Sequence, residues 1–405
     1  MTSHDSYAAL RVPNFRRLIL SYATSSAARE AQIVVVGWQV YDITKDPLAL
    51  GLIGLAEALP FIATALYAGH VADRANRRTL ALAGTCGLLL SAIALLVFTW
   101  MRITAVWPIY LVIFLSGIGR SFARPAVQAL SADLVPREIY SNAVAWRSST
   151  WQFAAVFGPA VGGMLYGFAG PAAAYAVVCV FMMISIVAIA WIQHNVRPAI
   201  ASEITVGESL RIGLKFVWNE PVVLAAMTLD LFAVLFGGAA ALLPIFARML
   251  SAGPEGLGIL RAAPAVGSFF VGISLAHRPP FRRAGRTLFL TVAAFGVCII
   301  LFAVSRNFYL SLVLLTFSGM FDQISVVIRG TLIQIATPAH LLGRVAAVNG
   351  IFIGSSNEIG AFESGVAARL MGTVPSVIFG GTMTLVVVAI IAIASPKLRQ
   401  LRELT

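Results

Sequence analysis

Long apolar runs separated by short polar breaks recur along the whole chain, from Phe15 to Ala394. A helix that crosses a membrane needs roughly 20 apolar residues, and runs of about this length leave no room for a soluble domain. The pattern predicts twelve spans, at 16–40, 48–69, 79–100, 106–131, 141–166, 171–192, 221–247, 256–277, 287–304, 308–335, 343–371 and 374–394. We therefore expect an all-α polytopic membrane protein with twelve transmembrane helices.

Composition agrees with this fold class, because 59% of the residues are hydrophobic, 11% are charged and the mean hydropathy is +0.88. The net charge of +12 would suggest nucleic acid as a partner of a soluble protein, but here it follows the polar breaks. With the N-terminus inside, alternate loops hold most of the basic residues, and the opposite loops hold only Lys45, Arg102, Arg248 and Arg306. This asymmetry predicts that both termini are cytoplasmic. It also predicts that the basic residues lie against the lipid bilayer, which is the expected partner.

The longest polar stretch, from His194 to Glu220, divides the chain into halves. We expect a six-helix bundle at 1–193, a cytoplasmic linker at 194–220, and a second six-helix bundle with a short tail at 221–405. Within the linker, 208–218 has one apolar and one basic side, as an interfacial amphipathic helix has. A helix that binds a partner is the alternative.

The halves resemble each other at an offset of 202 residues, which predicts a pseudo-symmetric internal repeat. The matching pairs are Gly117 with Gly319, Pro136 with Pro338, Gly158 with Gly360, and Gly163 with Gly365. Two parallel repeats related by an axis along the membrane normal are one known architecture of secondary transporters.

The most densely charged segment is 69–78, between the second and third predicted spans. We expect it to be a loop outside the hydrocarbon layer, with the glycine ending the preceding helix. Its pattern, Gly-x-x-x-Asp-Arg-x-x-Arg-Arg, resembles the signature loop of the major facilitator superfamily, although Asn76 stands where glycine is more usual. The resemblance implies the major facilitator fold and a gating role for Gly69, Asp73, Arg74, Arg77 and Arg78. A simple positive-inside tether is the alternative.

A second motif lies in the fifth span, where Gly158, Pro159, Gly162 and Gly163 form Gly-Pro-x-x-Gly-Gly. Close helix packing and a bend would explain these residues, but the arrangement also resembles a motif of exporters in the superfamily. The segments 342–350 and 133–136 further resemble the enterobactin-exporter and macrolide-efflux branch, which includes drug and proton antiporters. The resemblance does not fix a substrate.

Charged residues inside the spans are costly unless they are paired or hydrated. In facilitator proteins the first, fourth, seventh and tenth helices line the cavity, and Glu30, Arg120, Asp230 and Asp322 fall on these helices. We hypothesise that Arg120 and Asp322, which are equivalent in the repeat, face each other there. Arg124 lies one turn from Arg120, so an anionic substrate could meet two guanidinium groups.

Proton coupling requires a carboxyl whose proton affinity changes with its surroundings. The candidates are Glu30, which adjoins Arg29, and then Asp322, Asp230 and Glu358. The substrate or ion-pair candidates are Arg29, Arg120 and Arg124. Structural ion pairs are the alternative explanation for each of these residues.

These features predict a secondary active transporter of the inner membrane that exports a small organic molecule, a siderophore-like metabolite or a drug, by proton antiport with alternating access. A proton-coupled importer or facilitator of a nutrient is the first alternative, and a membrane sensor without transport is the second. The sequence holds no ATP-binding loop, metal-ligand cluster or nucleophile-and-base arrangement. We therefore expect no enzyme activity, no cofactor and no metal. We also expect the protein to be a monomer.

Overall fold

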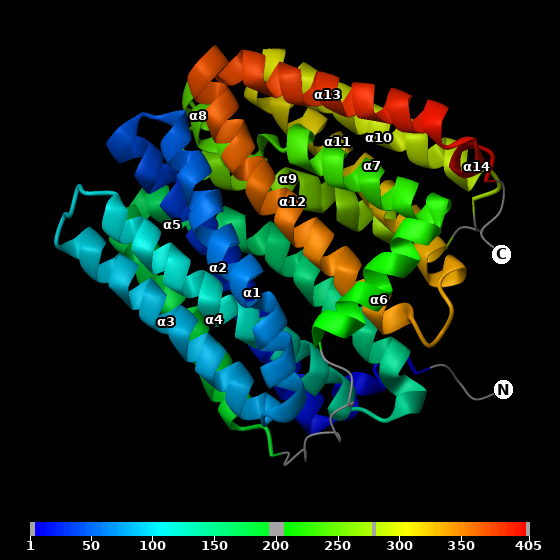
Figure 1. Ribbon diagram of the computed structural model, residues 1–405. Helices are drawn as coiled ribbons and strands as arrows, with labels where there is room; N and C mark the ends of the chain where they lie inside the picture. Colours follow the sequence, from blue (N-terminus) through cyan, green and yellow to red (C-terminus); the bar gives the residue numbers. More distant parts are fainter. Residues whose placement is uncertain (1–4, 194–205, 278–280, 402–405) are drawn as a thin grey trace. The chain divides into compact units, whose positions relative to one another are not determined.

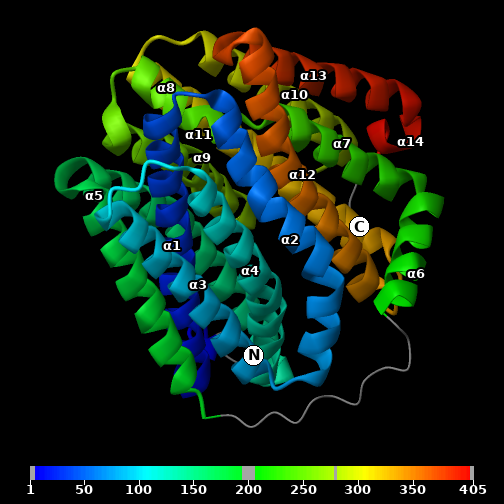
Figure 2. The same ribbon diagram turned by 60° about the vertical axis from the view of Figure 1, so that its left-hand side comes forward.

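The computed structural model describes residues 5–193, 206–277 and 281–401, which form helices and no strands. Figures 1 and 2 show the arrangement. The α-helices are α1 (Pro13–Thr44), α2 (Pro47–Arg74), α3 (Arg77–Trp100), α4 (Trp107–Asp133), α5 (Tyr140–Ala190), α6 (Val206–Asn219), α7 (Pro221–Gly237), α8 (Leu243–Met249), α9 (Gly253–Ala276), α10 (Ala284–Val304), α11 (Phe308–Ala336), α12 (Leu342–Met371), α13 (Thr373–Ala394) and α14 (Pro396–Arg399). Short 3₁₀ turns are η1 (Ala9–Arg11), η2 (Arg137–Ile139) and η3 (Ala239–Leu242).

The helices follow the predicted spans, with two informative differences. The fifth and sixth spans form one run, α5, which is broken where Gly170 adopts φ 82°. The seventh span is interrupted, because α7 ends at Gly237 and η3 separates it from α8. Two glycines at the break, Gly237 and Gly238, favour the interruption since they give little support to a helix.

The described chain contains eight segments that are long and apolar enough to cross a membrane, and one of them, Arg137–Ala190, holds both the fifth and sixth spans. The three predicted spans outside this set are α1, α4 and α12. These helices contain Arg29, Arg120 and Glu358 among other charged residues. Charged residues thus keep α1, α4 and α12 outside this apolar set.

Contacts divide the chain into two compact units. The first comprises Met1–Gln39 and Leu59–Glu203, and the second comprises Val40–Ala58 and Ile204–Thr405. The first therefore holds most of α1, the later part of α2, and α3 to α5, and the second holds α6 to α14. The end of α1 and the beginning of α2 belong to the second unit by their contacts.

Small residues set the helix spacing in the first unit. Helices α3 and α4 lie side by side in both views (Figures 1 and 2), and a Cβ built on Gly84 of α3 would lie 2.7 Å from Cβ of Ala123 on α4. In lipid, such close approach is the main source of helix association, because apolar side chains gain little by leaving hydrocarbon tails.

Small residues also set the helix spacing in the second unit. Helices α10 and α13 run side by side in both views (Figures 1 and 2), and a Cβ on Gly296 would lie 3.1 Å from the carbonyl oxygen of Gly381. A Cβ on Gly319 of α11 would lie 2.0 Å from the carbonyl oxygen of Pro264 on α9. Larger side chains at these positions would force the helices apart.

The backbone supports the internal repeat. Gly170 has φ 82° and ψ 170°, and Gly372, 202 residues later, has φ 92° and ψ 157°. Each is followed by the last span of its half, the second part of α5 or α13. Positive φ favours glycine, since other residues meet steric strain there.

The segment predicted as an amphipathic helix is occupied by α6. Its buried side is smaller than the sequence pattern suggests, because Val217 is packed in an apolar cluster with residues of α7 and α12 while Leu214 and Trp218 are exposed. A Cβ on Gly213 would lie 2.8 Å from the carbonyl oxygen of Arg344, so α6 lies directly against α12. Residues 194–205 of the predicted linker lie outside the described residues.

Candidate transport site

The charged segment 69–78 is mostly helical. Helix α2 continues to Arg74 and α3 begins at Arg77. The expectation that Gly69 ends the preceding helix was therefore wrong, because Gly69 lies within α2. The side chains of Asp73 and Arg74, like the surroundings of Gly69, lie outside the described residues.

Asn76 has a clear local function at the start of α3. Its side-chain oxygen accepts hydrogen bonds from the backbone N–H groups of Arg78, at 3.0 Å, and Thr79, at 3.2 Å. Asparagine is among the best residues for capping a helix N-terminus in this way. The departure from glycine at this position therefore gives α3 a cap.

The two following arginines bind other helices of the first unit. Arg77 donates from Nη1 to both carboxylate oxygens of Asp133 on α4, at 2.6 and 2.5 Å. Arg78 donates to the backbone carbonyls of Ile189, at 3.3 Å, and Ala190 near the end of α5. Sequence reasoning missed Asp133 as a partner, and the gating role of both arginines stays a prediction.

The Gly-Pro-x-x-Gly-Gly motif lies on the face of α5 that contacts α1. A Cβ on Gly158 would lie 2.6 Å from the carbonyl oxygen of Ala27, and one on Gly162 would lie 2.8 Å from Cα of Ala31. Pro159 and Gly163 are buried beside them. The motif therefore brings two helix backbones together, which Pro159 assists by removing one N–H from the helix ladder.

The equivalent contact occurs in the second unit. A Cβ on Gly360 of α12 would lie 2.7 Å from the carbonyl oxygen of Leu235 on α7. Gly360 is the repeat partner of Gly158, so each half places a glycine of its fifth helix against its first helix.

Helix α1 carries a polar group next to this contact. Arg29 and Glu30 form an ion pair with a distance of 3.1 Å from Nη1 to Oε1, and Glu30 is buried. Tyr22 lies two turns before Arg29 and therefore on the same side of the helix. Its hydroxyl is within hydrogen-bonding range of Ser26 and electrostatic range of Arg29.

Three further arginines gather around this group from α4 and α5. Arg120, Arg29 and Arg147 all lie within electrostatic range of Arg124, as does the hydroxyl of Tyr22. The Arg120 guanidinium carbon lies 4.8 Å from the centre of the Phe61 ring, a cation–π contact. Two of the predicted substrate candidates, Arg120 and Arg124, thus share a site with the third, Arg29.

The second unit pairs two of its intramembrane charges. Arg329 of α11 forms a buried ion pair with Asp230 of α7, with exposed side-chain fractions of 8% and 12%. Arg329 also donates from Nε to the carbonyl oxygen of Ser325, at 3.3 Å. The sequence could not predict this partner, since it lies on another helix with no spacing to mark it.

Asp322 lies two turns before Arg329 on α11 and is half-buried. It forms no hydrogen bond or ion pair with any residue that the structure describes. The pairing of Asp322 with Arg120 stays a prediction. Glu358 is half-buried on α12, and its carbonyl oxygen would lie 3.0 Å from a Cβ on Gly54.

Ion pairs also hold the turn between α1 and α2 within the second unit. Asp42 contacts Arg248 at 3.2 Å and Lys45 at 2.5 Å, and Asp46 contacts Arg369. Asp42 lies beyond the predicted span 16–40, and its hydrogen bond from Lys45 lowers its pKa. Sequence analysis counted Lys45 and Arg248 of this set only as loop charges.

Helix packing accompanies these pairs. A Cβ on Gly51 of α2 would lie 3.0 Å from Cα of Gly365 on α12, and one on Gly54 would lie 2.7 Å from Cβ of Ala361. Close backbone contact and an ion pair thus both hold the start of α2 against α12.

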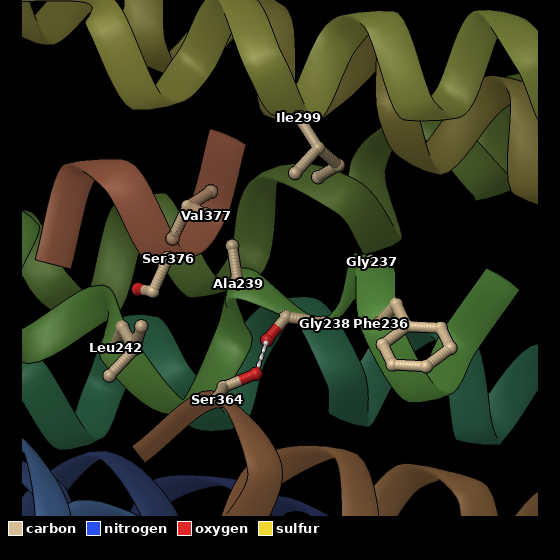
Figure 3. A pocket seen from close by; sticks show the side chains of 9 residues that line it. All are labelled: Phe236, Gly237, Gly238, Ala239, Leu242, Ile299, Ser364, Ser376 and Val377. Carbon is tan, nitrogen blue, oxygen red and sulfur yellow. Dashed lines mark hydrogen bonds between the residues drawn. The ribbon is translucent and has the colours of Figure 1, made fainter. Parts of the chain in front are cut away.

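A small pocket lies at the break between α7 and α8 (Figure 3). It is lined by Phe236, Gly237, Gly238, Ala239, Leu242, Ile299, Ser364, Ser376 and Val377. The Ser364 hydroxyl donates to the carbonyl oxygen of Gly238, at 3.1 Å, which satisfies a group that the interrupted helix leaves open (Figure 3). The empty volume of ≈ 180 Å³ is below the usual size of a drug-sized ligand site. We therefore assign the pocket to helix packing.

The described residues contain no group of three or more His, Cys, Asp or Glu side chains that could hold a metal ion.

In the described residues, eight segments long and apolar enough to cross a membrane, with equivalent glycine contacts in the two halves of the repeat, are typical of a multi-pass membrane transporter. The sequence matches the profile of the transmembrane secretion effector family over residues 4–404. The chain therefore belongs to this family of the major facilitator superfamily.

Individual relatives agree with the family. The chain is 24% identical over 397 residues to the enterobactin exporter EntS of Shigella boydii serotype 18, covering 96% of this chain and 94% of the relative. EntS of Escherichia coli O1:K1 gives the same identity and coverage. These relatives are transporters and not enzymes.

Solved structures confirm the fold. A peptide transporter, POT, in complex with alafosfalin has a TM-score of 0.75 at 12% identity, covering 99% of this chain and all of that chain (100%). The nucleoside transporter NupG has a TM-score of 0.74 at 10% identity, covering 94% and 99%. At these identities the likeness concerns the fold alone.

Proposed function

We propose that this protein exports a small organic molecule across the bacterial inner membrane, with both termini in the cytoplasm. The observation that carries the proposal is the similarity to enterobactin exporters along nearly the entire chain. The Gly-Pro-x-x-Gly-Gly contact between α5 and α1 supports it, because this motif resembles the one found in exporters. The export cargo is then a siderophore-like metabolite, with a drug as the competing class.

Export is driven by exchange for protons, and Asp322 is the proton carrier we propose. An adjacent cation stabilises the charged form of a carboxyl, which makes a paired carboxyl harder to protonate. Asp230 and Glu30 have such partners in Arg329 and Arg29, whereas Asp322 has none among the described residues. Asp322 can therefore load and release a proton as its surroundings change between the two access states.

The test compares small molecules inside and outside cells with and without the gene, at low and adequate iron. We expect a metal-chelating metabolite to accumulate in deletion cells and to return to the medium with the wild-type gene but not with Asp322→Asn. Glu138→Gln is the control, since Glu138 is exposed in η2 outside the predicted spans.

Three other outcomes would each replace the proposal. Unchanged metabolites with increased drug sensitivity would identify drug efflux as the function. Lost uptake of a nutrient would establish an importer. Ligand binding by the purified protein without any flux in vesicles would identify a sensor.

A further inference from the structure

The structure assigns an oxyanion-binding site to the first unit, formed by Arg29 of α1, Arg120 and Arg124 of α4 and Arg147 of α5, and we propose that its ligand is the cargo, an organic anion with two or more acidic groups. The proposal rests on the proposed export function only in calling this anion the cargo.

The four arginines share one region because of their positions on three helices. Arg120 and Arg124 are one turn apart on α4, so their side chains leave the same face, separated by about 6 Å along the axis. Arg29 and Tyr22 share a face of α1. The close contact of Gly158 on α5 with Ala27 on α1 brings two of these helices together, and Arg124 lies within electrostatic range of Arg120, Arg29 and Arg147.

Guanidinium groups crowd this region. Arg124 lies within electrostatic range of three other arginines, and the Glu30 carboxylate pairs with Arg29. Arg124 and Arg147 form no hydrogen bond or ion pair with any described residue. Like charges within electrostatic range of one another repel, and the repulsion is strong where water is scarce, so a bound anion would relieve it.

The site lies well inside the helices and not at their ends. Arg124 precedes the end of α4, Asp133, by about 13 Å, and Arg147 follows the start of α5, Tyr140, by about 10 Å. Arg124 is nevertheless exposed, and Arg29 and Arg147 are half-buried. The Arg124 guanidinium therefore has an open side that a ligand can occupy, on a helix where an unmatched charge is costly.

The chemistry selects carboxylate, phosphonate or catecholate groups. Guanidinium presents a planar fork of N–H donors, which matches two oxygens of one acidic group. Two arginines from α4 and one each from α1 and α5 can serve more than one such group. The Phe61 ring beneath Arg120 and the Tyr22 ring beside the cluster add surfaces against which the carbon frame of the ligand can pack.

Binding by the purified full-length protein tests the assignment. The probe is carboxyfluorescein, an organic anion with at least two charges at pH 7.5, and rhodamine 123 is a cation built on the same ring system. We expect fluorescence polarisation to show binding of the anion and little binding of the cation. Arg124→Gln and Arg147→Gln should each weaken anion binding about tenfold or more, as expected for a lost charged hydrogen bond.

Two further variants separate charge from folding. Arg124→Lys keeps the charge and should retain more affinity than Arg124→Gln, while Arg16→Gln, an exposed arginine at the start of α1, should bind like wild type. Equal binding of both probes, or unchanged anion binding in both glutamine variants, would overturn the assignment. Displacement of the probe by a few phosphatidylglycerol molecules per protein would overturn the cargo assignment, since a lipid headgroup would then be the ligand.

Failure of this inference is distinguishable from failure of the proposed function. Proton-driven efflux of a metabolite with no arginine-dependent anion binding would contradict the site and leave export intact. Arginine-dependent anion binding without any flux would preserve the site and contradict export.

Discussion

Arg77 and Asp133 form the best-defined ion pair near the charged segment, with exposed side-chain fractions of 16% and 20%. We expect Arg77→Gln and Asp133→Asn each to lower stability by about 1–3 kcal/mol, because the remaining charge loses its partner in a poorly hydrated site. Thermal unfolding in detergent measures this, with the exposed Arg137→Gln as control. Equal melting temperatures for all three variants and wild type would contradict the structural role of the pair.

The buried pair of Asp230 and Arg329 gives a second prediction. Asp230→Asn alone should destabilise the chain by about 3–5 kcal/mol, since it leaves the Arg329 charge buried without compensation. The double variant Asp230→Asn with Arg329→Gln should recover much of this loss. A double variant as unstable as the sum of both single variants would show that the charges act independently.

These pairs illustrate what the sequence can predict at the residue scale. Arg29 and Glu30 are neighbours along the chain, so their ion pair follows from adjacency. Asp133 and Arg77 come from different helices, as do Asp230 and Arg329, and their partners depend on how the helices rotate and pack. The candidate residues were therefore identifiable as charges within the spans, while most partners required the structure.

At the scale of helices, the close packing of α5 against α1 gives a further prediction. We expect Gly162→Val to abolish transport, because even its Cβ would lie 2.8 Å from Cα of Ala31, and the branched side chain would push the helices apart. Gly350→Ala is the control, since nothing lies within 4 Å of a Cβ there. Metabolite efflux per correctly inserted protein is the measurement, and normal efflux by Gly162→Val would contradict the packing requirement.

The turn between α1 and α2 provides a prediction about pH. The pKa of Asp42 is lowered in the folded chain, so its stabilising contribution is fully present above the ordinary value of 3.8 and is lost as pH falls through the lower folded value. The effect of Asp42→Asn on melting temperature should therefore be constant from pH 5 to pH 8. A change in that effect within this range would mean that another group controls the pairs.

Helix boundaries were largely predictable, because hydrophobic runs and polar breaks fix where a chain can leave the bilayer. The break after Gly237 was not predicted, since only Gly237 and Gly238 mark it in the run from 221 to 247. Ser364, whose hydroxyl binds the carbonyl oxygen of Gly238, lies far along the chain. The prediction that Gly69 ends a helix was wrong for a related reason. Glycine permits a helix end but does not require one, and α2 is held in helical form to Arg74.

At the scale of the whole molecule, the repeat organises the function. Both halves place a glycine of the fifth helix against the first, and both bend the chain at an equivalent glycine, Gly170 or Gly372. The charges differ between the halves, because the first gathers arginines while the second holds the Asp230–Arg329 pair and Asp322. We propose that the first unit binds the anionic cargo and the second carries the proton.

The most direct test of proton-driven export uses everted membrane vesicles with a pH-sensitive dye that is quenched when respiration acidifies the lumen. Adding the metabolite fraction from wild-type medium should restore fluorescence, since cargo enters as protons leave, and Asp322→Asn vesicles should give no response. Contradiction would come from a wild-type signal identical to that of vesicles lacking the protein, or from one unaffected by Asp322→Asn.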